Sequence, residues 1–285
     1  MNVVEPQQSP KSPEHWNDTV VKIRQSIANM VFMAYLRGDA HVVSCIGTIE
    51  ILVNLFNNGF DFTNDVLLIS KGHAALALYS VLFENGKISR EEFLSFRTEY
   101  SEFGIHVSGK LGNLSRLSSG SLGHGIGFGS GIALSRKKTS EKGKIFVVVG
   151  DGELNEGSNY EALQIAVTNK LNNLVILVDH NKVQSVGCYS EISGETSLVK
   201  KFQSFGFVAK DISNNMSFKN HFAVGVNERN SPIALIYDSS ANSSLPNLQG
   251  KILWHYRRPN REDLLEVLEL LNIDESVIRE RLGLA

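Results

Sequence analysis

The stretch KIFVVVGDGELNEG (residues 144–157) joins an apolar run rich in β-branched residues to an aspartate between two glycines, followed by two further acids. Because the run has no polar alternation, it is typical of a strand buried on both faces of a parallel sheet. Similar runs occupy residues 65–70, 173–179 and 231–238, and a weaker one lies at 205–211. Helical patterns separate them, so the sequence predicts an α/β fold with a doubly wound, mostly parallel sheet and helices on both faces.

Helices are predicted where apolar residues recur at helical spacing or where a capping residue marks an end. One of them, HAALALYSVLFENG, closes on Gly86 as its C-terminal cap. Between residues 104 and 121 there is no period, which predicts a long irregular loop of the functional kind. The predicted helices span residues 17–36, 48–56, 73–86, 89–98, 155–169, 198–204 and 218–228.

Composition excludes several classes of function. The 285 residues are 42% hydrophobic with a net charge of −2, so the basic surplus expected of a nucleic-acid or anionic-membrane binder is missing. The two cysteines, Cys45 and Cys188, cannot build a disulfide framework or a cysteine-based zinc site. The chain start lacks a signal-peptide pattern and no window is apolar enough to span a membrane, so we expect a cytoplasmic protein. Residues 1–15 are predicted to be a flexible tail and residues 16–285 a single domain.

Polar groups follow two of the predicted strands at the edge where ligands bind in doubly wound sheets. Asp151 ends one strand, and Asp179 and Asn181 end another, with Val183 just beyond. A carboxylate, an amide oxygen and a backbone carbonyl are hard ligands that suit Mg²⁺ or Ca²⁺. The alternative is that Asp151 only caps the following helix and that Asn181 lies in a turn; the residues alone leave both open.

The spacing of these groups resembles the GDG…N signature of thiamine-diphosphate enzymes, because residues 153–180 separate the GDG triplet from the asparagine. The resemblance implies that Asp151, Asn181 and the Val183 carbonyl hold the Mg²⁺ (or Ca²⁺) of thiamine diphosphate. It also implies that the diphosphate lies against residues of the triplet and its neighbour, namely Gly150, Asp151, Gly152 and Glu153.

Two further segments resemble the transketolase branch of that superfamily. ISKGHAALALYSVL (69–82) is similar to the SKGHAA…LY motif, and GSLGHGIGFGSGIALSRK (120–137) is similar to the GSLGQG…GMALA segment, with His124 where glutamine is usual. A weaker similarity lies in RGDAHVVSCIGTIEIL (37–52). The resemblance covers about residues 17–265, corresponds to the N-terminal, diphosphate-binding half of a transketolase, and adds cofactor contacts at Gly120, Ser121 and Leu122.

Four histidines match transketolase positions: His41, His73, His106 and His255. The matches are imperfect, because Val42-Val43 replaces the usual Pro-Gly and Ile105 replaces a glycine before His106. By resemblance they surround the reacting centre, and imidazole suits proton exchange with sugar hydroxyls at neutral pH. Each one alone has the alternative of a capping or core histidine.

The family protonates the cofactor's aminopyrimidine with a glutamate of a second, pyrimidine-binding domain. The resemblance therefore implies the first subunit of a split transketolase, active only with a C-terminal, pyrimidine-domain subunit in an α2β2 assembly. It would transfer a two-carbon ketol unit from a ketose or ketose phosphate to an aldose. Glu156 and Glu161 are expected at the subunit interface; a solvated helix start is their alternative.

Two departures from the family pattern leave other functions open. Leu114-Ser115-Arg116 stands where GVE is expected, and SSANSS (239–244) stands where split-subunit relatives carry TxKGKG. An atypical acceptor, as in a carbohydrate or secondary-metabolite synthase, a 2-oxo acid dehydrogenase-like subunit, and a non-catalytic binding or regulatory paralogue are the alternatives. A dinucleotide-binding fold is disfavoured, because the glycines of 123–131 follow a loop and not a strand.

Overall fold

Five parallel strands form the centre of the structure, a computed structural model that describes residues 18–38, 41–184, 187–194, 196–212, 230–242 and 257–284. Every pair of neighbouring strands is parallel, and the spatial order is β1-β2-β3-β7-β6. The predicted fold class is therefore confirmed, with each strand inside its predicted run. The strands are β1 Val66–Ile69, β2 Ile145–Gly150, β3 Leu174–Asp179, β6 Val208–Asp211 and β7 Ile233–Tyr237.

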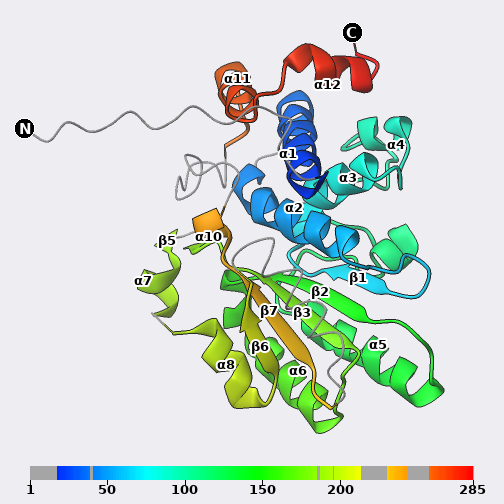
Figure 1. Ribbon diagram of the computed structural model, residues 1–285, viewed down its shortest axis with the longest axis vertical. Helices are drawn as coiled ribbons and strands as arrows, with labels where there is room; N and C mark the ends of the chain where they lie inside the picture. Colours follow the sequence, from blue (N-terminus) through cyan, green and yellow to red (C-terminus); the bar gives the residue numbers. More distant parts are fainter. Residues whose placement is uncertain are drawn as a thin grey trace, which may run out of the picture.

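The central strands are apolar throughout because both faces of the sheet are covered. In β2, Phe146 and Val148 contribute to the core on one face, whereas Val147 and Val149 contribute to the core on the other. Side chains alternate across a strand, so a strand between two helical layers needs an apolar residue at every position. Figure 1 shows the two layers, one above and one below the sheet.

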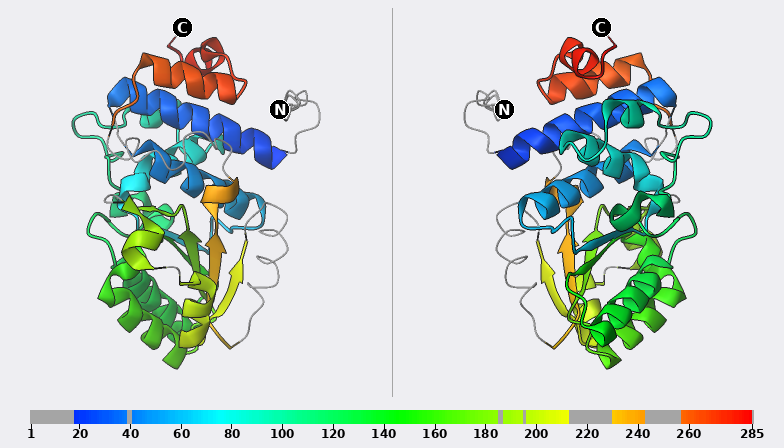
Figure 2. Two further views of the ribbon diagram at one scale, coloured as in Figure 1. Left: turned by 90° about the vertical axis from the view of Figure 1, so that its left-hand side faces the viewer. Right: turned by 90° about the vertical axis from the view of Figure 1, so that its right-hand side faces the viewer.

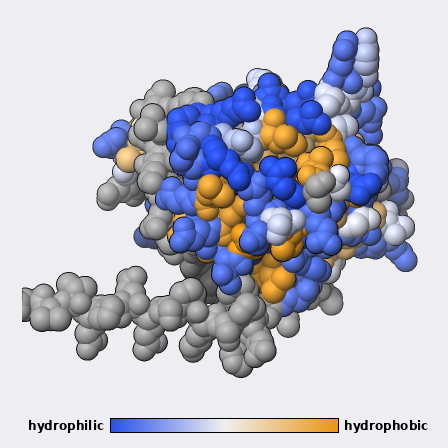
Figure 3. All heavy atoms as spheres, turned by 90° about the horizontal axis from the view of Figure 1, so that it is seen from above, coloured by the Kyte–Doolittle hydropathy of each residue, from blue (hydrophilic) through white to orange (hydrophobic). Residues whose placement is uncertain are grey.

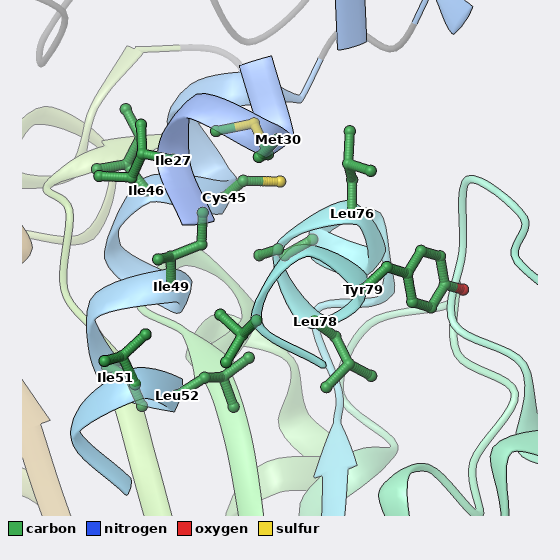
Figure 4. Close-up of a cluster of buried hydrophobic side chains, with 14 of the residues drawn as sticks. Ile27, Met30, Cys45, Ile46, Ile49, Ile51, Leu52, Leu76, Leu78 and Tyr79 are labelled. Carbon is green, nitrogen blue, oxygen red and sulfur yellow. The ribbon is translucent and has the colours of Figure 1, made fainter. Parts of the chain in front are cut away.

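The upper layer consists of α1 Asp18–Arg37, α2 Val42–Asn57 and α3 Ala75–Glu84, with α11 Arg261–Leu270 and α12 Glu275–Arg281 at its outer end (Figure 1, Figure 2). Figure 4 shows how side chains of the first three helices meet in one buried cluster that includes Cys45. The apolar stripes of these helices therefore bury against one another as well as against the sheet.

The lower layer consists of α5 Gly125–Thr139, α6 Gly157–Thr168 and α8 Leu198–Phe205. Helix α5 was not predicted, since its glycines hide the helical period. One of those glycines permits a close approach, because a Cβ on Gly129 would lie 2.6 Å from Cγ2 of Val147 in the sheet. Helix α5 can therefore lie this close to the sheet only because Gly129 has no side chain.

Short elements connect the layers. Helix α4 opens with a capping box in which Ser89 and Glu92 bond each other's backbone N–H groups. Val183–Gln184 and Gly187–Cys188 pair as two antiparallel strands that were not predicted. The short elements are η2 Gly72–Ala74, α4 Arg90–Leu94, η3 Gly109–Leu114, η4 Gly152–Asn155, β4 Val183–Gln184, β5 Gly187–Cys188, α7 Tyr189–Ser193 and α10 Ser239–Asn242.

Several helix boundaries differ from prediction; α4, for example, ends at Leu94 and not at residue 98. Helix α2 begins at Val42, before the predicted start at residue 48. Helix α3 ends at Glu84, and Gly86 follows in a left-handed conformation with φ 62°, which explains why glycine closes this helix. The predicted tail (1–15) and the predicted helix at 218–228 lie outside the described residues.

The surface is mostly polar. Seen from above, separate hydrophobic patches interrupt a hydrophilic face (Figure 3). Exposed apolar side chains on α11 and α12 include Leu265 and Val277. Within the described residues, none of the helices combines the length and apolar character that crossing a membrane requires.

Candidate cofactor site

A pocket of about 360 Å³ opens where the carboxyl ends of β1, β2 and β3 meet. It brings together residues that the sequence analysis selected from several separate segments of the chain. Three lining residues were not selected: Ser44, Lys71 and Gln184. The selected residues that line it are His41, His73, His106, Gly120, Leu122, Gly150, Asp151, Gly152, Glu153, Asn181 and Val183.

Asp151 lies at the end of β2 with only 2% of its surface exposed. Its Oδ1 accepts from the Gly152 N–H at 2.7 Å, and its Oδ2 accepts from the Lys182 N–H at 2.8 Å and lies 2.9 Å from Nδ1 of His180. Asp151 is therefore the N-cap of the short η4, whereas the helix that the alternative had it cap, α6, begins at Gly157 with Glu156 as its N-cap. A carboxylate has about four lone-pair positions, so one remains for a cation in the pocket.

His180 was not among the predicted site residues. Its side chain is only 17% exposed and stacks edge-on against Tyr189 with ring centroids 5.2 Å apart. Together with its contact to Asp151, this stacking holds the carboxylate in one orientation at the pocket wall. His180 directly precedes the candidate ligand Asn181, and no sequence pattern around it indicates this role.

Asn181 and Val183 follow β3. The Asn181 Oδ1 accepts from the Val183 N–H at 2.9 Å, so the predicted turn alternative is also present. No cluster of three or more histidine, cysteine, aspartate or glutamate side chains suited to a metal occurs within the part of the chain that the structure describes. A cation here would draw on one carboxylate, an amide oxygen, a carbonyl and the oxygens of its ligand, which is a donor set that Mg²⁺ accepts.

Two glycines of the pocket leave room for a bulky anion. A Cβ on Gly150 would meet nothing closer than Cδ of Lys71 at 4.0 Å, and a Cβ on Gly120 would meet only Cδ2 of His106 at 3.7 Å. The space beside both backbones is therefore open, as a bound diphosphate requires. The residues present fit thiamine diphosphate with a divalent cation.

Three of the predicted histidines share the pocket. His41 precedes α2 and His73 lies in η2, and their ring centroids are 5.3 Å apart. His106 lies on the loop that precedes Gly120. The buried side chain of Tyr79 supports this loop, because its hydroxyl donates to the His106 carbonyl at 3.5 Å. The fourth, His255, lies outside the described residues.

A buried ion pair beneath the pocket was missed by the sequence analysis. Nζ of Lys71 lies 2.6 Å from Oδ2 of Asp179 and donates to the Ser44 carbonyl at 2.9 Å, and both charged side chains are at most 2% exposed. Thr48 and Ser239 donate to the same carboxylate at 3.2 and 2.6 Å. Asp179 ends its strand as predicted, but its carboxylate binds these buried side chains of the protein.

Glu153 lines the pocket but bonds to the protein with both oxygens. Its carboxylate accepts from the Ser70 hydroxyl, from the Gly123 N–H at 2.9 Å and from the Gly150 N–H at 3.3 Å. Burial raises the pKa of this carboxyl, and the hydrogen bonds partly oppose that increase. Its predicted contact with the cofactor remains a prediction.

The remaining predicted residues lie around the pocket. Ser121 is exposed beside Gly120, and Glu156 and Glu161 are exposed at the start of α6. In the altered loop, Ser115 is fully buried and donates to the Leu117 carbonyl at 3.0 Å, so it supports the loop. Residues 243 and 244 of the second altered loop lie outside the described residues.

The chain is similar to known proteins over most of its length. Residues 50–239 match the family described as transketolase, thiamine diphosphate binding domain. A subunit of the apulose-4-phosphate transketolase of Actinobacillus succinogenes is 31% identical over 259 residues, which are 87% of this chain and 93% of that protein. Human transketolase is 29% identical over 84% of this chain but only 39% of its own length. The crystal structure of Campylobacter jejuni transketolase superposes with a TM-score of 0.78 at 23% identity, covering 93% of this chain and 45% of that one.

Proposed function

The chain belongs to the transketolase family, and from this premise we propose that it is the thiamine-diphosphate-binding subunit of a two-subunit transketolase. The enzyme transfers a two-carbon ketol unit from a ketose or ketose phosphate to an aldose. One observation carries the proposal: the pocket that holds Asp151 and Asn181 also holds three histidines from distant segments. A scaffold that only bound a partner would not need that combination.

In this proposal each wall of the pocket has one task. Asp151, Asn181 and the Val183 carbonyl hold Mg²⁺, which neutralises the diphosphate. The backbone at Gly120, Ser121, Leu122, Gly150 and Gly152 would contact the diphosphate itself. When bound, thiamine diphosphate would supply the nucleophilic carbon that ketol transfer requires.

The histidines handle protons. His41, His73, His106 and His255 accept protons from the sugar hydroxyls and return them to the carbonyl oxygen as the carbon–carbon bond breaks and forms. Imidazole does this near neutral pH because its pKa lies there. The contact between the rings of His41 and His73 keeps two such groups side by side.

The proposed partner is a separate C-terminal subunit that carries the pyrimidine-binding domain. Two relatives that match most of their own length are named as single subunits of an apulose-4-phosphate transketolase, which supports a divided enzyme. Glu156 and Glu161 are exposed beside the pocket and available to this partner. We propose an α2β2 assembly; a stable and active αβ unit in a mass measurement of the co-expressed pair would contradict it.

The proposed compartment is the cytoplasm. Cys45 is buried, Cys188 is exposed, and neither forms a disulfide, which suits a reducing environment.

The first experiment is thermal unfolding of the purified chain with thiamine diphosphate, with and without Mg²⁺. Ligand at about 100 times its dissociation constant should stabilise the folded state by about 2.7 kcal/mol. The Asp151→Ala variant should lose this Mg²⁺-dependent shift. The matched control is Asp65→Ala, which also removes a buried carboxylate that accepts two backbone N–H groups, but at the opposite end of the sheet. An equal shift in the wild type and the Asp151→Ala variant would contradict the metal assignment.

A second measurement separates the transketolase from its alternatives. The chain and its partner subunit are assayed together with ketose phosphates and aldose acceptors. Ketol transfer that is lost in the His73→Ala variant supports the proposal. Cofactor binding without any transfer would favour a non-catalytic paralogue, and transfer to an unrelated acceptor would favour an atypical synthase.

A further inference from the structure

We propose that Glu153 and Ser70 are positioning residues that fix the separation of two walls of the pocket and do not themselves bind the cofactor. The inference rests on the proposed function, because it assigns these walls to the diphosphate. It goes beyond that function by identifying what holds the binding backbone in place.

The two side chains form one buried network. Oε1 of Glu153 accepts from the Ser70 hydroxyl and from the Gly123 N–H at 2.9 Å, and Oε2 accepts from the Gly150 N–H at 3.3 Å. The Ser70 oxygen accepts in turn from the Gly125 N–H at 3.0 Å. Glu153 is 2% exposed and Ser70 is 1% exposed, so no bulk water competes for these bonds.

This network joins three segments that are far apart in sequence. Ser70 follows β1, Gly150 ends β2, and Gly123 and Gly125 lie at the entry to α5. The backbone just before Gly123 and the backbone at Gly150 both border the pocket. A single carboxylate therefore sets how far apart these two parts of the wall stand.

At Gly123 and Gly125 a side chain would collide with neighbouring residues. A Cβ on Gly125 would overlap the side chain of Ser70. Gly123 has φ +85°, and a Cβ there would lie 2.6 Å from Cβ of Glu156. The loop can reach the carboxylate only without side chains at these positions.

Glu153 is poorly placed to bind an anion directly. Its oxygens accept hydrogen bonds from three donors of the protein, and a carboxylate beside a diphosphate would repel it. Groups that orient a binding site from behind typically change affinity about 10- to 100-fold when they are removed. Glu153 fits this description, since it holds Gly150, which lines the pocket, and Gly123, which directly follows the lining residue Leu122.

The experiment measures the affinity of the full chain for thiamine diphosphate with Mg²⁺ by calorimetry. In Glu153→Gln the amide NH₂ faces N–H donors, so we expect binding at least about 10-fold weaker than in the wild type. Ser70→Ala should weaken binding in the same direction. Because the two side chains act in one network, the double variant should lose less affinity than the two single effects multiplied.

The matched control is Asp65→Asn. Asp65 is a buried carboxylate that accepts from the Lys144 and Asp61 N–H groups at 2.7 and 2.9 Å, at the other end of β1 and β2. Its replacement should lower the melting temperature but leave cofactor affinity within about 2-fold. Equal loss of affinity in both variants would show a stability effect and overturn the inference, as would wild-type affinity in Glu153→Gln.

Hydrogen exchange of the ligand-free chains separates this inference from the proposed function. The amides of Gly123, Gly125 and Gly150 should exchange faster in Glu153→Gln than in the wild type, and their exchange should be unchanged in Asp65→Asn. If the wild type binds no cofactor even together with its partner subunit, the proposed function fails while faster exchange still supports the positioning role. Unchanged exchange in Glu153→Gln overturns the positioning role whatever the cofactor does.

Discussion

Lys71 carries a buried positive charge that is paired with Asp179. It lies in the segment that carries His73, yet its ammonium group points to Asp179 at the end of β3. Removing one partner of a buried pair leaves an uncompensated charge, which destabilises far more than the pair itself stabilises. The pair therefore ties the His73 segment to β3 and, through the Ser44 carbonyl, to α2.

The first prediction follows from this pair. Lys71→Met should lower the free energy of unfolding by about 3–5 kcal/mol, because Asp179 remains buried without its cation. Lys110→Met is the control, since its pair with Glu102 at 3.4 Å is largely exposed and should contribute about 0–1 kcal/mol. Urea unfolding measures both; similar losses in the two variants would contradict the argument.

The second prediction concerns Gly47 in the middle of α2. A Cβ at this position would overlap Oδ1 of Asp179 and would lie 2.7 Å from the Ser239 side chain. Gly47→Ala should therefore destabilise the chain by about 1–3 kcal/mol through overpacking. In Gly131→Ala the new Cβ meets nothing within 4 Å, and this control should be stabilised by about 0.5–1 kcal/mol, as is usual for alanine over glycine in a helix. Thermal melts that rank the two variants the other way would refute the packing explanation.

At the scale of elements, the last turn of α3 is held to two other helices through Glu84. Its Oε2 accepts from Asn29 of α1 at 3.3 Å and from Arg281 of α12 at 2.7 Å. Burial raises the pKa of the Glu84 carboxyl, although Arg281 partly opposes this. The folded chain therefore keeps a proton on Glu84 at a higher pH than the unfolded chain does.

The third prediction gives the sign of the resulting pH dependence. Where the folded state binds more protons, stability falls as pH rises. The stability of the wild type relative to Glu84→Gln should thus be greatest below the unfolded pKa and should decline as pH rises through the folded pKa. Urea unfolding at several pH values between about 4.5 and 7.5 covers this window. Arg281→Met should extend the decline to higher pH, and a wild type that gains relative stability over the window would contradict the assignment.

Elements with a strong period could be predicted, and elements that depend on close approach could not. The strand at 144–150 was recognised from its continuous apolar run, and the helix at 17–36 from apolar residues at helical spacing. Helix α5 was missed because its contact with the sheet is made at Gly129, which has no side chain. Its sequence therefore lacks the apolar residue that a helical pattern would show at this position. The antiparallel pair of β4 and β5 was missed because its two-residue strands are too short to show alternation.

At the scale of the whole molecule, the site was partly predictable because a parallel sheet brings the ends of its strands to one edge. That topology brings Asp151, Asn181 and His73, each of which follows a strand, to the same pocket. It does not say which way each side chain points, so Lys71 and the Glu153 network could not be recognised from spacing alone. Their contacts join segments that follow different strands, so they depend on how neighbouring strands are aligned. The sequence alone does not give that alignment.

The last prediction concerns the assembly. In the proposed function, this chain would contribute the diphosphate side of the cofactor pocket and the partner subunit would contribute the pyrimidine side. A ligand that touches both chains must couple their association to its own binding. If the partner tightens cofactor binding by some factor, the cofactor with Mg²⁺ must tighten partner binding by the same factor, commonly about 5- to 150-fold.

Both factors can be measured on the same proteins. Calorimetry gives the affinity of the chain for thiamine diphosphate with and without saturating partner, and analytical ultracentrifugation gives its affinity for the partner with and without cofactor. In Asp151→Ala both effects should vanish together, whereas Asp65→Ala should retain both because it lies at the far end of the sheet. If the affinity for the partner subunit is the same with and without the cofactor, the cofactor does not contact both chains. The proposal of a two-subunit site would then be wrong.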